Sequence, residues 1–216
     1  MNPLFPISAL CALAYLPLAS RPQGNLRSLI KTCAVVGLAL AAALTGATEL
    51  ALALGLCSLG DLLLSRDGDG AFAAGVAAFA AGHVAYILLF LGLPGSTPVR
   101  LVQVPAAWGV LVILGLGVSM ARLLAPRAGA LRLPVLIYIP IILGMGLAAL
   151  TLPFNGPFAW VQSAALAFIL SDLILAVEKF LLPAGHRTRR VTSFLIWGLY
   201  WGAQAGFFLA LNGGGA

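Results

Sequence analysis

Two aspartates lie inside stretches that otherwise have the composition of membrane-spanning helices. Asp61 belongs to the segment LCSLGDLLLS and Asp172 to the segment AFILSDLILA, so each follows a small residue and precedes three aliphatic ones. A carboxyl group at the centre of a spanning helix costs about 2.5–3.5 kcal/mol, and acidic residues at this depth usually mark a functional site. Asp61 and Asp172 are therefore the candidate catalytic residues of this chain.

Two carboxyl groups that share a site of low dielectric constant are suited to acid catalysis. Because like charges repel strongly there, one group keeps its proton near neutral pH while the other is ionised. The protonated group can act as a general acid, and the ionised group can stabilise a cation and orient water. The sequence does not indicate which aspartate takes which role.

The composition predicts a polytopic membrane protein, since 62% of the residues are hydrophobic, 8% are charged and the mean hydropathy is +1.07. A spanning helix needs roughly 17–20 apolar residues. We expect an all-α bundle of eight transmembrane helices that forms a single integral membrane domain over residues 1–216. The expected helices cover residues 3–19, 28–45, 48–64, 71–93, 101–120, 133–151, 157–177 and 193–211.

The basic residues are distributed unevenly between the two ends of these helices. We assign eleven of the twelve to the connections that follow the first, third, fifth and seventh helices, and only Arg100 to the opposite side. The positive-inside rule then predicts cytoplasmic basic loops and both termini outside the cell membrane, the inner membrane in a bacterium. Anionic lipid headgroups account for the net charge of +6, so we expect membrane lipids and no nucleic acid as partners.

The two aspartate motifs are 111 residues apart, in the third and seventh expected helices. A spacing of four helices is consistent with a parallel 4+4 repeat, in which equivalent residues lie at equal depth. Asp61 is three residues from the expected inner end of its helix and Asp172 is five residues from its own. If the two helices pack together, both carboxyl groups can face one cavity.

The other polar side chains at membrane depth are candidate substrate-binding residues. Helical spacing brings neighbouring members of this set onto common helix faces, although packing or hydrogen bonding between helices is an alternative role for each. We expect no Lys or Arg at the depth of the aspartates, and the irregularly spaced cysteines indicate neither a disulfide framework nor a metal site. The candidates are His83, Tyr86, Lys179, Tyr200 and Gln204.

The sequence motifs resemble those of the YhhN family of multi-pass membrane proteins, which includes lysoplasmalogenases. The resemblance rests on SLGDLLL at residues 58–64, FAAGHVAYILLF at 79–90, AFILSDLILAVEKF at 167–180 and the weaker YWGAQ at 200–204. It implies an eight-helix bundle and hydrolysis of the vinyl-ether bond of lysoplasmalogens (1-alkenyl lysophospholipids), which releases a fatty aldehyde and a glycerophospho-headgroup. It also implies that Asp61 and Asp172 are the catalytic acids.

Acid catalysis by a carboxyl pair is compatible with this reaction. Protonation of the β-carbon of a vinyl ether gives an oxocarbenium ion, water captures the ion, and the resulting hemiacetal collapses. The reaction needs no cofactor. We expect Lys179 or Arg66 to bind the phosphate, and the remaining polar candidates to hold water or the ether oxygen.

A proton-coupled transporter or lipid carrier that uses the same two aspartates is the main alternative. Transport requires acids near the membrane midplane with polar residues on both sides of them, whereas in this chain the acids lie in one leaflet. Intramembrane aspartyl proteases also use two aspartates, but one of theirs follows tyrosine, and here Ser171 precedes Asp172. Zinc hydrolases of the ceramidase type need three histidines, and this chain has two.

Overall fold

The computed structural model describes residues 3–183 and 185–212, and over these residues the fold is helical with no β-strand. Short 3-10 helices flank or join some of the α-helices, at Leu16–Leu18 (η1), Pro98–Val102 (η2) and Gly129–Leu131 (η3). The α-helices are α1 (Leu4–Tyr15), α2 (Asn25–Leu44), α3 (Thr48–Leu64), α4 (Asp69–Gly92), α5 (Ala106–Leu124), α6 (Arg132–Leu150), α7 (Gly156–Phe180) and α8 (Thr188–Leu211).

Six helical segments of the described chain are long and apolar enough to cross a membrane, namely α2, α4, α5, η3 with α6, α7 and α8. This result confirms a multi-pass, all-α membrane protein. The remaining two α-helices are shorter, at 12 residues for α1 and 17 residues for α3. Eight complete spans and a 4+4 repeat therefore remain predictions.

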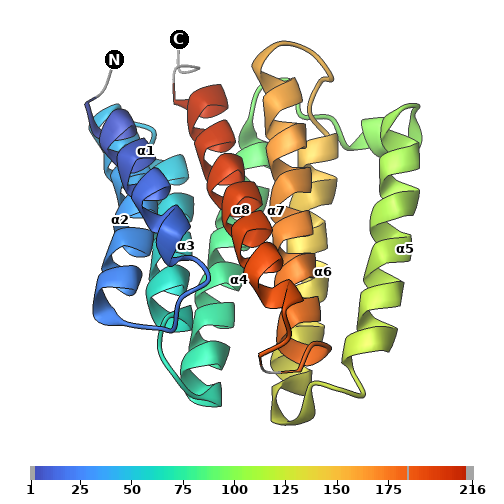
Figure 1. The fold of residues 1–216 in the computed structure, drawn as a ribbon. Helices are drawn as coiled ribbons and strands as arrows, with labels where there is room; N and C mark the ends of the chain where they lie inside the picture. Colours follow the sequence, from blue (N-terminus) through green and yellow to red (C-terminus); the bar gives the residue numbers. More distant parts are fainter. Residues whose placement is uncertain (1–2, 184, 213–216) are drawn as a thin grey trace.

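The helices run alternately up and down, so that α1 begins and α8 ends at the same end of the bundle (Figure 1). The connections that follow α1, α3, α5 and α7 lie at the opposite end, which is the end we predicted to be rich in basic residues (Figure 1). In addition to neighbours along the chain, α4 packs against α6 and α8 packs against α2. A 4+4 repeat would relate these two pairs.

Several helices differ in length from the segments that hydropathy predicted. Helix α8 begins at Thr188 rather than residue 193, and α7 ends at Phe180 rather than residue 177. Hydropathy reports the apolar part of a helix, whereas the backbone hydrogen bonds continue into the polar interface. Prolines account for two boundaries, because Pro17 lies in η1 after the end of α1, and Pro105 is the N-cap of α5, which begins at Ala106 rather than residue 101.

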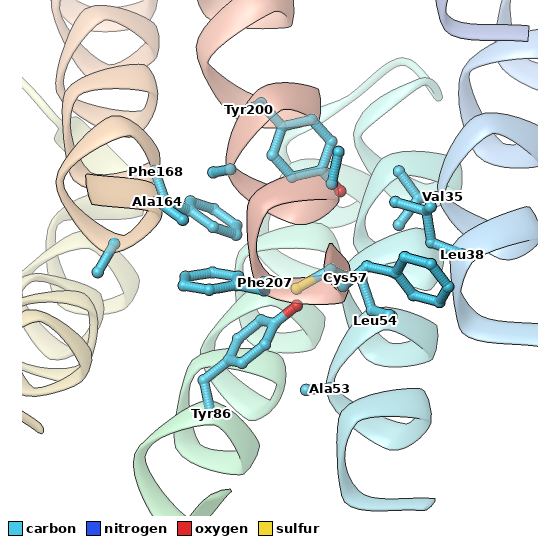
Figure 2. Close-up of a cluster of buried hydrophobic side chains, with 14 of the residues drawn as sticks. Val35, Leu38, Ala53, Leu54, Cys57, Tyr86, Ala164, Phe168, Tyr200 and Phe207 are labelled. Carbon is cyan, nitrogen blue, oxygen red and sulfur yellow. The ribbon is translucent and has the colours of Figure 1, made fainter. Parts of the chain in front are cut away.

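Close packing of α3 against α4 depends on glycines. A methyl group at Gly82 would lie 2.7 Å from Sγ of Cys57, and one at Gly60 would lie 2.5 Å from the ring of Phe79. Small residues let helix backbones approach in this way inside membranes. Beyond this contact, aromatic rings from α4, α7 and α8 fill the centre of the bundle, as Figure 2 shows for Tyr86, Phe168 and Phe207.

Candidate active site

A cavity of about 430 Å³ lies in the half of the bundle that carries the connections after α1, α3, α5 and α7. Its wall includes residues of α2 and of every later α-helix. Asp61 of α3 and Asp172 of α7 both line it. Asp61 is three residues from the last residue of α3, and Asp172 is eight residues from the last residue of the longer α7.

Asp61 has two polar partners and is fully buried. Lys31 Nζ lies 2.8 Å from Oδ1 of Asp61 in an ion pair, and the Tyr200 hydroxyl donates a hydrogen bond of 2.6 Å to Oδ2. Lys31 lies inside α2, within the helix expected over residues 28–45, although we counted its charge with the preceding connection. Our expectation that no Lys or Arg reaches the depth of the aspartates is therefore wrong. The error arose because a lysine near a helix end can direct its long side chain along the bundle wall.

Asp172 has other polar partners than Asp61. The Tyr138 hydroxyl of α6 donates a hydrogen bond to Oδ2 of Asp172, and Asp172 forms no ion pair with any described residue. Lys31 and Asp61 line the same cavity as Asp172. Sequence reasoning missed Tyr138, because nothing in the α6 sequence indicates which face of that helix lies against α7.

Two predicted binding residues, Lys179 and Tyr200, line the cavity together with the aspartates. The Lys179 ammonium group lies 4.6 Å from the ring centroid of Phe72, in a cation–π contact. Arg66, the other predicted phosphate ligand, also lines the cavity and donates a hydrogen bond of 3.3 Å to Asn25 Oδ1. Both cations keep hydrogen-bond donors that could bind an anionic headgroup.

The other three predicted binding residues, His83, Tyr86 and Gln204, are fully buried and are absent from the described lining of the cavity. The Tyr86 hydroxyl donates a hydrogen bond of 2.6 Å to Gln204 Oε1, and Figure 2 shows the Tyr86 side chain directed toward Cys57 of α3. Helical spacing placed these side chains in the bundle interior, but it could not separate a cavity wall from the layer behind it.

The His83 ring packs against Tyr138, which lines the cavity. The ring centroid of His83 is 5.5 Å from that of Tyr138 and 4.6 Å from that of Phe168, and both contacts are edge-to-face. Nδ1 lies 2.6 Å from the Phe79 carbonyl oxygen, and Nε2 has no partner among the described residues. His83 thus contacts the hydrogen-bond donor of Asp172 without reaching the cavity.

Two arginines that sequence reasoning did not propose as ligands line the mouth of the cavity, which is its part nearest the connections after α1, α3, α5 and α7. Arg27 donates hydrogen bonds to the Tyr15 hydroxyl at 3.2 Å and to the Ala19 carbonyl oxygen at 3.1 Å. Arg189 lies 3.7 Å from the Glu178 carboxylate and donates to the Glu178 carbonyl oxygen at 2.6 Å, which ties α8 to the end of α7. Arg27 has no carboxylate partner among the described residues, so its charge is available to a ligand.

The arrangement combines an ion-paired carboxylate, a second carboxyl group bound only to a phenol, and cations at the mouth. In the part of the chain that the structure describes, no three His, Cys, Asp or Glu side chains are grouped as metal ligands. All three cysteines are free. The polar groups of the cavity are those needed for proton transfer and for binding an anion.

Comparison with known proteins gives a family and a relative. The family model of the YhhN family matches residues 26–211. The chain is similar to the lysoplasmalogenase TMEM86A of Bos taurus, with 31% identity over 165 residues, which is 73% of this chain. The chain spans 62% of the length of that relative. No solved structure matches the chain.

Proposed function

This chain belongs to the YhhN family, and on that premise we propose that it is a membrane-embedded hydrolase of lysoplasmalogens. It cleaves the vinyl-ether bond of a 1-alkenyl lysophospholipid to a fatty aldehyde and a glycerophospho-headgroup. The observation that carries this proposal is that Asp61 and Asp172 line one cavity with unequal partners. The name of the relative supports the choice of substrate.

The unequal partners suggest a division of roles. The ion pair with Lys31 and the hydrogen bond from Tyr200 favour an ionised Asp61. Asp172 has no ion pair with a described residue and shares the cavity with the negative charge of Asp61, which favours its protonated form. Asp172 is then the general acid, and Asp61 is the carboxylate that stabilises the oxocarbenium ion and orients water.

In the proposed reaction, Asp172 donates its proton to the β-carbon of the vinyl ether, and the π electrons form the new C–H bond. The positive charge is shared between the ether oxygen and the adjacent carbon, near the Asp61 carboxylate. Water attacks that carbon and returns a proton to Asp172. The hemiacetal hydroxyl then loses its proton as the C=O bond forms, the bond to the glycerol oxygen breaks, that oxygen takes up a proton, and the aldehyde leaves.

The headgroup phosphate is placed by the cations at the mouth of the cavity. Arg27, Arg66 and Lys179 line it without a carboxylate partner among the described residues. A phosphate in a partly buried site is bound best by such charged donors. The lipid would therefore enter with its headgroup at this mouth and its vinyl ether beside the aspartates.

The shape of the cavity favours a hydrolase over a carrier. A carrier must bind its cargo from both sides of the membrane, which requires a path through the bundle. Here the buried residues Phe79 and Tyr200 line the cavity, and Phe168 and Phe207 are buried in the core. Counted along their helices, the charged lining residues lie nearer than Phe79 and Tyr200 to the end of the bundle that carries the connections after α1, α3, α5 and α7.

We also propose that the end of the bundle with the basic connections faces the cytoplasm and that both termini lie outside, in the cell membrane. The uneven distribution of Lys and Arg supports this orientation. A reporter fused after Ala216 should be active only outside the cell, and one inserted between α7 and α8 only in the cytoplasm. The reverse pattern would place the cavity mouth at the outer face.

The function is tested with purified protein in detergent. We expect release of fatty aldehyde from a 1-alkenyl lysophospholipid and none from the 1-alkyl analogue, because only the vinyl ether forms a stabilised cation when carbon is protonated. A slower rate in deuterated water would indicate proton transfer to carbon in the rate-limiting step. Equal cleavage of the 1-acyl lipid, or complete loss of activity with EDTA, would contradict the carboxyl-pair mechanism.

A further inference from the structure

One wall of the cavity is apolar and comes from two adjacent helices. Helix α5 contributes Leu116, Gly117 and Met120, and α6 contributes Ile139 and Leu143. The carboxyl groups and the cations at the mouth come from other helices. The cavity is therefore amphipathic, with its apolar wall beside Asp172, which accepts a hydrogen bond from Tyr138 of α6.

Helix α5 is the most weakly attached helix of the bundle. Its close packing partners among the described elements are α6 and η2, and Figure 1 shows it at the edge of the bundle. Only 11% of its apolar window is buried, against 33–44% for the other candidate spans. A wall formed by such a helix borders the surrounding lipid on its far side.

The apolar wall lies at about the depth of the aspartates. Gly117 is seven residues before the end of α5, and Asp172 is eight residues before the end of α7. At 1.5 Å per residue, these positions are about 10 and 12 Å from the respective helix ends, which lie at the same end of the bundle. A chain attached to a group beside Asp172 can therefore pass sideways along α5 and α6.

Gly117 controls how much room this wall leaves. A methyl group at Gly117 would lie 2.5 Å from Cδ1 of Leu143, so any side chain there would displace the Leu143 side chain. Since Leu143 itself lines the cavity, the displaced side chain would narrow it. Two residues earlier on the same helix, Gly115 has no atom within 4 Å of its equivalent methyl position.

We propose that the wall formed by α5 and α6 receives the alkenyl chain of the lipid and that Gly117 sets the chain length the enzyme accepts. This inference rests on the proposed function, because it assigns the chain of that substrate. Selection by chain length is steric. Lipid tails are as apolar as the wall, so moving the alkenyl chain from the membrane to the wall gains little free energy. A narrowed wall should therefore exclude long chains and still admit short ones.

The test compares Gly117→Leu with the matched control Gly115→Leu on short, medium and long 1-alkenyl lysophospholipids. We expect kcat/KM of Gly117→Leu for the long chain to fall about tenfold relative to the short chain, and the ratio for Gly115→Leu to stay as in the wild type. An equal loss at all chain lengths in Gly117→Leu, or the same change in Gly115→Leu, would overturn the proposal. If Gly117→Leu does not fold, Met120→Trp narrows the same wall and carries the same expectation.

A binding measurement separates this inference from the proposed function. Native mass spectrometry can record how 1-alkyl lysophospholipids of two chain lengths, which the enzyme should not cleave, bind to the wild type and to both variants. Weaker binding of the long analogue by Gly117→Leu alone would support the assigned wall even if no aldehyde were ever released. Unchanged binding by Gly117→Leu would refute the wall even if the wild type were an active hydrolase.

Discussion

Asp61 and Asp172 have nearly the same sequence context, SLGDLLL and ILSDLIL, yet their surroundings in the fold differ. Helix α2 gives Asp61 the ammonium group of Lys31, whereas α6 gives Asp172 the hydroxyl of Tyr138. Asp61 is also fully buried, while Asp172 is partly exposed to the cavity. Similar motifs can thus hold carboxyl groups with different polar partners, because neighbouring helices supply those partners.

The largest effect that this comparison predicts is that of Asp172→Asn. If Asp172 is the general acid, its removal should lower kcat by about 10²–10⁴-fold. Asparagine keeps an oxygen that can accept the Tyr138 hydrogen bond, so the thermal unfolding temperature in detergent should stay close to that of the wild type. Aldehyde release and thermal unfolding are the two measurements.

The control for Asp172→Asn is Asp67→Asn, because Asp67 lines the cavity from the connection after α3 and is exposed. This variant should keep its activity. If Asp172→Asn were active while Asp61→Asn was inactive, the proposed roles of the two aspartates would have to be exchanged.

The second prediction concerns Asp61→Asn, which should lower activity strongly, though less than Asp172→Asn, and should also lower stability. The substitution leaves the Lys31 charge without its carboxylate, and an unsatisfied polar group costs about 1–3 kcal/mol when buried, more when it is charged and less when it is partly exposed. We therefore expect a lower unfolding temperature for Asp61→Asn than for Asp172→Asn. Equal stability of the two variants would contradict the difference between the two sites.

A double variant separates the stabilising role of Asp61 from its chemical role. Lys31→Met combined with Asp61→Asn removes both charges, so much of the lost stability should return. Activity should not return, because no carboxylate is left to stabilise the cation. Recovery of activity in the double variant would show that Asp61 serves only to neutralise Lys31.

The sequence predicted the helical fold and the two aspartates better than it predicted their partners. Apolar segments locate helices reliably because a spanning helix must satisfy its backbone hydrogen bonds internally. Lys31 was missed as a partner because we counted its charge with the basic connection before the second expected helix, although residue 31 lies within that helix. Tyr138 was missed because helix-to-helix neighbours depend on packing between segments that are distant in sequence.

For the buried polar candidates, too, the sequence did not indicate which residues would be their neighbours in the fold. Helical spacing identified His83, Tyr86 and Gln204 as interior residues, and they are buried as expected for that position. Whether an interior residue lines a cavity depends on which neighbouring side chains stand in front of it. Tyr138 packs against His83 and lines the cavity in its place, and the sequence around neither residue indicates this contact.

The third prediction compares the two tyrosines that donate to the carboxyl groups. Tyr138→Phe removes the only hydrogen-bond partner found for Asp172 among the described residues, whereas Tyr200→Phe leaves Asp61 held by Lys31. A net hydrogen bond contributes about 0.5–1.5 kcal/mol, which corresponds to roughly twofold to tenfold in rate. We expect Tyr138→Phe near the upper value and Tyr200→Phe near the lower one, measured as kcat. The opposite order would mean that Asp172 is positioned by a group other than Tyr138.

The smallest expected effect is that of His83→Phe, which tests whether the histidine takes part in the chemistry or only supports Tyr138. Phenylalanine keeps a ring against Tyr138 and Phe168, and the Phe79 carbonyl oxygen that loses Nδ1 still lies within the α4 hydrogen-bond pattern. Activity should therefore stay within about twofold of the wild type, as expected when one neutral hydrogen bond is lost. His83→Ala, in contrast, would leave space behind Tyr138 and should lower both stability and activity through packing. A large loss of activity in a stably folded His83→Phe would instead show that the unpartnered Nε2 contacts water or substrate, and the cavity would then have to extend behind Tyr138.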